Sequence, residues 1–132
     1  MDEKKKATGI GGVFIRCQDA TAQRNWYNQH LGFNAGQYGA NFEWRDIENP
    51  EKKGTTVWST FPQNTTYFGP SEQGYMINVR VADLEWLLGE LKKEGIEPVA
   101  PMQVYDYGKF AHITDPEGNR IELWEPADES VL

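Results

Sequence analysis

The sequence contains an internal repeat. The stretch from Phe14 to Asp19 aligns with the stretch from Asn78 to Asp83 at a constant offset of 64 residues. In each copy a strand-like segment carries an arginine and leads to an aspartate, a residue that favours the start of a helix. In each copy the helix then ends near a glycine. Because repeated sequence units fold alike, we expect two copies of one supersecondary unit.

The first copy contains a strand, a helix and three strand-like segments, in that order. We expect them at residues 10–17, 19–31, 41–46, 55–61 and 65–68. Asp19 or Thr21 is suited to cap the helix and Gly32 to end it. The pair Gly69-Pro70 then closes the first copy.

The second copy repeats this order and carries the strongest helical signal of the chain. Leu84, Leu87, Leu88 and Leu91 follow the i, i+3, i+4, i+7 spacing of a helix with one apolar face. We expect a strand at residues 75–81 before this helix and an extended segment from residue 99 after it. Residues 109–114 and 120–124 then form a hairpin around the turn at residues 115–119.

The order β-α-β-β-β therefore occurs twice in 132 residues, the length of one average domain. We predict an α+β fold with two tandem βαβββ modules in a curved, mixed and largely antiparallel sheet. The modules cover about residues 9–70 and about residues 74–126 of a single domain at residues 9–126. Residues 1–8 and 127–132 are expected to be flexible tails.

Composition excludes several classes of function. The chain has 20 acidic and 13 basic residues and a net charge of −7, whereas nucleic-acid binding needs a basic face. It has no apolar run long enough to span a membrane and no secretory signal behind its charged start. A single cysteine, Cys17, supports neither a disulfide framework nor a thiolate metal cluster. We therefore expect a cytoplasmic protein without nucleic-acid or membrane partners.

Two motifs resemble a known superfamily. They are NWYNQHLGF at residues 25–33 and TDPEGNRIEL at residues 114–123. Together with the repeat, they are similar to the vicinal oxygen chelate superfamily, which includes glyoxalase I, extradiol dioxygenases, and fosfomycin and bleomycin resistance proteins. The resemblance implies that the sheet curls around a cup with the helices outside, and that the protein forms a homodimer.

The resemblance also implies where a metal would bind. Metal-dependent members place ligands on the first and last strands of each module, positions that here fall on Gly12, near Thr66, on Met76 and on Glu122. Glycine has no donor atom, and a thioether is a poor ligand for a hard divalent ion. We therefore expect no metal cofactor, with a divalent metal at Glu122 as the alternative. The chain is closest in type to the metal-free or bleomycin-resistance-like members.

Strand parity suggests which side chains face the cup, because alternate residues of a strand point in opposite directions. Six candidate ligand-binding residues have this parity, namely Phe14, Arg16, Met76, Asn78, Arg80 and Trp124. Trp44 and Trp58 are added as further aromatic candidates. The tryptophans either line the cup or pack in the core. Arg16 and Arg80 either bind an anionic group of a ligand or pair with the nearby Asp19 and Asp83.

Glu122 and His112 are the candidate catalytic residues. Both lie five residues from Glu117, the centre of the expected turn, so they should be neighbours across the hairpin. A carboxylate beside His112 would raise the pKa of the imidazole and permit acid–base chemistry. Alternatively, each side chain satisfies only a structural hydrogen bond or ion pair, and a register slip of one residue would separate them.

Two functions follow. In the first, an aromatic cup binds a small organic molecule, planar or cationic, without a divalent metal. In the second, the chain is an enzyme, a lyase, isomerase or dioxygenase of the same superfamily. It would use Glu122 and His112 either in a non-standard metal site or as a metal-free acid–base pair.

Overall fold

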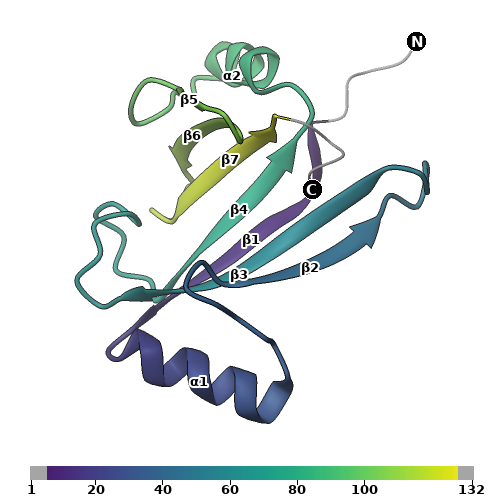
Figure 1. Ribbon diagram of the computed structural model, residues 1–132. Coiled ribbons are helices and arrows are strands. Elements are labelled where there is room, and N and C mark those ends of the chain that lie inside the picture. The colour runs from purple at the N-terminus through teal and green to yellow at the C-terminus, as the bar shows by residue number, and fades with distance from the viewer. Residues whose placement is uncertain (1–5, 128–132) are drawn as a thin grey trace.

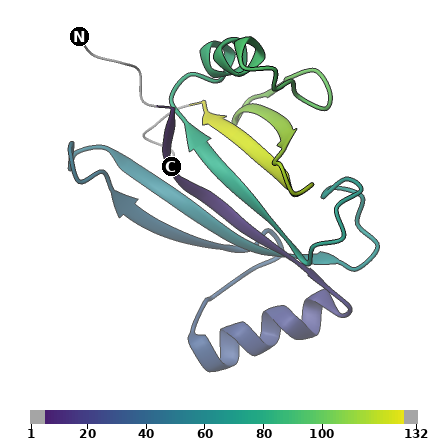
Figure 2. The ribbon, with the colours of Figure 1, turned by 180° about the vertical axis from the view of Figure 1, so that it is seen from behind.

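The computed structural model describes residues 6–127, which form one mixed sheet and two helices (Figures 1 and 2). In this part of the chain seven strands follow the order β2-β3-β1-β4-β7-β6-β5. The strands are β1 (Ala7–Cys17), β2 (Ala40–Arg45), β3 (Lys53–Pro62), β4 (Tyr75–Val81), β5 (Gln103–Tyr105), β6 (Gly108–Thr114) and β7 (Arg120–Pro126), and the helices are α1 (Ala20–Leu31) and α2 (Leu84–Lys93). The predicted α+β class is confirmed. Strand β1 begins at Ala7, inside the range 1–8 that was predicted as a tail. Residues 1–5 and 128–132 lie outside the described chain.

The two modules of the sequence repeat occupy equivalent positions in the sheet. At its centre β1 and β4 run antiparallel, with Gly12 paired to Asn78 and Phe14 paired to Met76. At the repeat offset of 64 residues, Gly12 corresponds to Met76 and Phe14 corresponds to Asn78, so the repeat turns each of these two pairs into the other. Each first strand also has a parallel neighbour, β3 beside β1 and β7 beside β4. The two modules are therefore related by an approximate two-fold axis through the β1–β4 pair.

Module one has one strand fewer than predicted. Residues 65–68 form turns rather than a strand, and its last strand is β3, the counterpart of β7. The strand equivalent to β5 is reduced to an isolated bridge between Gly36 and Gly39. The Asn28 side chain instead bonds both the N–H and the carbonyl of Ala35, which holds this connection against α1.

The predicted helix caps are present. Asp19 accepts the backbone N–H of Ala22 at 2.9 Å, and Asp83 accepts that of Trp86 at 3.0 Å. Gly32 ends α1 with a φ of 68°. Neither helix of the described chain combines the length and apolar character that crossing a bilayer requires.

The two helices stand at opposite ends of the molecule (Figure 1). Strand pairing nevertheless places both on the same face of the sheet. Trp58, on the α1 side, is paired with Val13, and Val13 is paired with Ile77, so all three project to one face. Under α2, the core of module two consists of Val81, Leu84, Leu87, Ala111 and Leu123. We call the opposite face, turned away from α1 and α2, the inner face.

Candidate functional site

A buried carboxylate lies on the inner face of module two. Glu122 is 2% exposed, and its two oxygens accept hydrogen bonds from three side chains. Asn78 Nδ2 donates at 2.7 Å, and the Tyr67 hydroxyl donates to the other oxygen. His112 Nε2 lies 3.0 Å from that same oxygen. Donors have thus replaced the water that this carboxylate loses on burial.

Strand register brings three of these residues together. Asn78 on β4 pairs with Glu122 on β7, and Glu122 pairs with His112 on β6. The predicted cross-strand pair of His112 and Glu122 is confirmed. Tyr67 comes instead from the β3–β4 loop (residues 63–74), a segment whose sequence has no period that would place it here.

The proton positions in this cluster follow from its outermost member. Arg120 Nη1 lies 3.0 Å from His112 Nδ1. Because a guanidinium only donates, Nδ1 accepts, and the ring proton is on Nε2 and points to Glu122. Burial and the Glu122 charge raise the pKa of the Tyr67 phenol, which keeps its proton on the oxygen that donates to Glu122.

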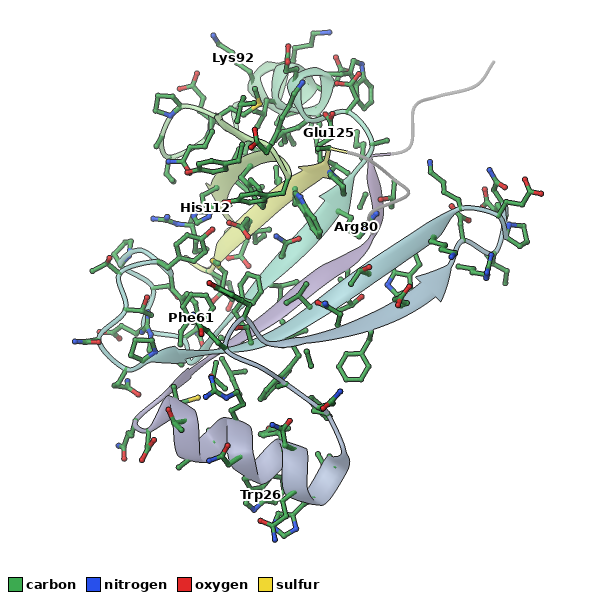
Figure 3. The ribbon with its side chains drawn as sticks, in the orientation of Figure 1. Trp26, Phe61, Arg80, Lys92, His112 and Glu125 are labelled. Atoms are coloured by element: carbon green, nitrogen blue, oxygen red, sulfur yellow. The ribbon has the colours of Figure 1, made fainter. Side chains whose placement is uncertain are left out.

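Aromatic rings extend the inner face beyond this cluster. The rings of Phe110 and Trp124 are parallel, with an interplanar angle of 6° and centroids 5.9 Å apart. The Arg80 guanidinium lies 5.2 Å from the Trp124 ring and 5.4 Å from the Trp44 ring. Figure 3 shows Arg80, His112 and Phe61 in the region between the two helices, whereas Trp26 lies on the far side of α1.

Two candidate ligand-binding residues are not available to a ligand. Trp58 lies on the helix face, where its ring packs against Tyr27 at 4.4 Å and Phe33 at 4.9 Å. Of the two alternatives for this tryptophan, core packing fits the structure, because its β1 partner Val13 faces α1. Met76 has inner-face parity but is 0% exposed, so it contributes to packing.

The other module-one candidates pack on aromatic rings. Phe14 contacts Phe61, with the ring centroids 5.4 Å apart. The Arg16 guanidinium lies 4.8 Å from the Phe68 ring and donates to the Ser71 carbonyl, so the expected pairing with the local aspartate is not made.

A cavity of about 240 Å³ opens beside His112, between β6 and the β3–β4 loop. Its lining includes Thr66, Tyr67, Gln103, Phe110, His112 and Arg120. Tyr67, Phe110 and Arg120 were not among the predicted site residues. Strand parity does place Arg120 on the inner face, because it is two residues before Glu122 on the same strand, but parity alone does not mark it as a site residue.

Comparisons with known proteins identify the family. The family model described as the Glyoxalase/Bleomycin resistance protein/Dioxygenase superfamily matches residues 9–123. The chain belongs to this superfamily. No curated protein sequence matches it significantly.

Solved structures of the superfamily share the fold. The methylmalonyl-CoA epimerase from Mycobacterium tuberculosis has a TM-score of 0.65 and 19% identity, with 99% of this chain and 96% of that chain covered. A methylmalonyl-CoA epimerase in complex with methylmalonyl-CoA and NH4+ has a TM-score of 0.66 and 17% identity, with 93% and 97% covered. A superfamily member from Vibrio splendidus 12B01 has a TM-score of 0.54 and 14% identity, with 88% and 97% covered. At these identities the likeness shows the fold alone.

The residues at the superfamily's metal positions do not fit a divalent ion. Because β3 is the counterpart of β7, the position equivalent to Glu122 is Ser59, not a residue near Thr66. The four positions thus hold Gly12, Ser59, Met76 and Glu122, with one carboxylate among them. The described residues contain no group of three or more His, Cys, Asp and Glu side chains placed to hold a metal.

Proposed function

We propose that the chain binds a small organic molecule on its aromatic inner face without a divalent metal. The observation that carries this proposal is the environment of Glu122. Its lone pairs are engaged by Tyr67, Asn78 and His112, protein donors that stand where a cation would need to be. The only carboxylate of the superfamily's metal positions is therefore committed to a hydrogen-bond cluster.

The rings of module two support binding of a planar molecule. Tyr67 is 42% exposed and Tyr105 is 44% exposed, while Phe110 and Trp124 are half-buried. Flat rings that are fixed in place and partly accessible offer stacking area at little cost in side-chain entropy. A cationic ligand, the other class considered from composition, is disfavoured because Arg16, Arg80 and Arg120 all have inner-face parity.

An enzyme is the second candidate function, and the 3.0 Å contact between His112 and Glu122 favours it. The carboxylate fixes the imidazole with its lone pair on Nδ1, the arrangement that a general base needs. In this structure Arg120 donates to that nitrogen, so the base acts only after Arg120 moves. If an activity is found, Glu122→Gln should abolish it; unchanged turnover and binding would contradict both roles of Glu122.

Elemental analysis and native mass spectrometry of protein purified without chelators test the first function. We expect no stoichiometric metal and binding of planar organic compounds, with methylmalonyl-CoA included because two structural neighbours are its epimerases. Trp124→Ala should weaken binding on the order of tenfold. Trp26→Ala, on the far side of α1, is the matched control. Stoichiometric Mn, Fe, Ni or Zn, or no binding of any compound, would contradict the proposal.

We also propose that the protein forms a homodimer, by analogy with the superfamily, and that it is cytoplasmic, from its composition. A molar mass measured by light scattering across protein concentrations tests the dimer.

A further inference from the structure

The cavity beside His112 carries a cationic side chain in an acidic protein. Its lining contains one guanidinium, that of Arg120, and no aspartate or glutamate. The whole chain nevertheless has a net charge of −7. A cation enclosed with no acid beside it creates a local potential that attracts anions.

Arg120 has an unusual partner. Its Nη1 donates to the neutral nitrogen of His112 at 3.0 Å. Within residues 6–127 no carboxylate lies at ion-pair distance from it. Lysines elsewhere on the surface do pair with acids, as Lys109 does with Glu85 at 2.9 Å. A hydrogen bond from a guanidinium to a carboxylate is stronger than one to a neutral acceptor, so an incoming acid would displace His112.

The backbone is shaped to hold this guanidinium. Gly69 has a φ of 65°, and a Cβ built there would lie 2.0 Å from Arg120 Nη2. Glycine therefore favours the turn and leaves room for the close approach of the side chain. Gly69 on one side and His112 on the other fix the direction of the guanidinium before any ligand arrives, which lowers the entropy lost on binding.

Glu122 makes no ion pair with Arg120. Its carboxylate is 2% exposed, and the imidazole of His112 stands between it and Arg120. Its hydrogen bonds come from Tyr67, Asn78 and His112 and leave the guanidinium for another acceptor.

We propose that this cavity binds a small aromatic carboxylate. The carboxylate of the ligand accepts two hydrogen bonds from the Arg120 guanidinium, and the aromatic ring of the ligand lies against Phe110 and Tyr67. The apolar part of the lining, Val99 to Pro101, and the single guanidinium favour a carboxylate with a flat apolar body over an inorganic or phosphorylated anion. This inference rests on the proposed function and names its ligand class.

Isothermal titration with benzoate, phenylacetate and their neutral amides tests the ligand class on the wild-type protein. We expect the two acids to bind at least about tenfold more tightly than the amides. Inorganic phosphate, titrated alone, should not bind. Equal affinity for acid and amide, or binding of phosphate in place of the acids, would overturn the carboxylate assignment and leave binding of a neutral organic molecule intact.

Variants of Arg120 test the site itself. Arg120→Gln should lower the affinity for the acids at least about tenfold and leave the affinity for the amides unchanged. Arg120→Lys keeps the charge but not the planar guanidinium, so its affinity for the acids should lie between those of the wild type and of Arg120→Gln. Arg45→Gln removes the same charge from an exposed position on β2 and is the matched control. If Arg120→Gln does not fold, the affinities of Arg120→Lys and the comparison of acids with amides on the wild type decide whether Arg120 binds the acid group. Unchanged acid affinity in a folded Arg120 variant would overturn the inference.

Discussion

The Glu122 carboxylate illustrates how a buried charge is stabilised by neighbours that are fixed independently. Asn78 and His112 are held by sheet register on the two strands that flank Glu122. Tyr67 adds a third donor from the β3–β4 loop. A carboxylate with hydrogen bonds on both oxygens is a structural anchor for three elements, and it is also the group that orients His112.

Tyr67 gives this cluster a pH dependence in the alkaline range. Burial and the Glu122 charge raise the pKa of the folded phenol above its ordinary value of 10.0. Above that pH the unfolded chain loses the tyrosine proton while the folded chain keeps it, so folding stability falls as pH rises. We expect the free energy of unfolding to fall less steeply above about pH 10 in Tyr67→Phe than in the wild type.

Urea denaturation at a series of alkaline pH values measures this slope. Tyr38→Phe changes a tyrosine that is 85% exposed and should keep the wild-type slope. Identical slopes for the wild type and Tyr67→Phe would show that the Tyr67 proton is not held by the fold.

At the scale of elements, local signals predicted most of the strands and both helices. The α2 leucines, the two capping aspartates and the hairpin around residues 115–119 each act over a few residues, and the structure has all of them. The pair of His112 and Glu122 was predictable because a short turn fixes the register of its hairpin.

Features set by distant contacts were not predictable. The strand-like residues 65–68 form turns, since β3 and not this segment pairs with β1. The sequence left open whether Trp58 lines the cup or packs in the core, because parity within β3 depends on its register with β1. Tyr67 reaches Glu122 from a loop, and no periodic pattern marks such a residue.

Strand β1 crosses the molecular centre with little room for side chains. It has a register shift between Ile10 and Gly12, and a Cβ on Gly11 would lie 2.2 Å from Asn78 Oδ1 and 2.8 Å from Arg80 Cγ. Gly11→Ala should therefore displace Asn78 from Glu122 and lower the free energy of unfolding by about 1–3 kcal/mol.

Gly89 provides the matched control for this substitution. It lies inside α2 with nothing within 4 Å of the built Cβ. Gly89→Ala should raise the free energy of unfolding by about 0.5–1 kcal/mol, because alanine restricts the unfolded chain and favours a helix. Chemical denaturation of the two variants should thus give effects of opposite sign. Destabilisation of similar size in both would mean that β1 is not specifically crowded.

At the scale of the whole molecule, duplication has produced a symmetric sheet with asymmetric contents. The exchange of the Gly12–Asn78 and Phe14–Met76 pairs shows that both modules retain the same register. Module two has the carboxylate, the imidazole and the accessible rings, whereas module one has Ser59 at the position of Glu122 and a face filled by Phe14, Phe61 and Phe68. The candidate binding groups therefore lie mainly in one half of the sheet.

This asymmetry predicts how the protein responds to metal ions. A divalent site at the superfamily position needs donors from both modules, and only Glu122 is suited to supply one. An ion that binds the folded chain at 100 times its Kd would stabilise it by about 2.7 kcal/mol. We expect no rise in Tm when Mn, Ni, Co or Zn is added to the untagged protein, and no fall when a chelator is added, in scanning calorimetry. The same scans with benzoate should show a rise in Tm, which provides a positive control for linkage. A metal-dependent rise that Glu122→Gln removes would establish a cation site at Glu122 and contradict the metal-free assignment.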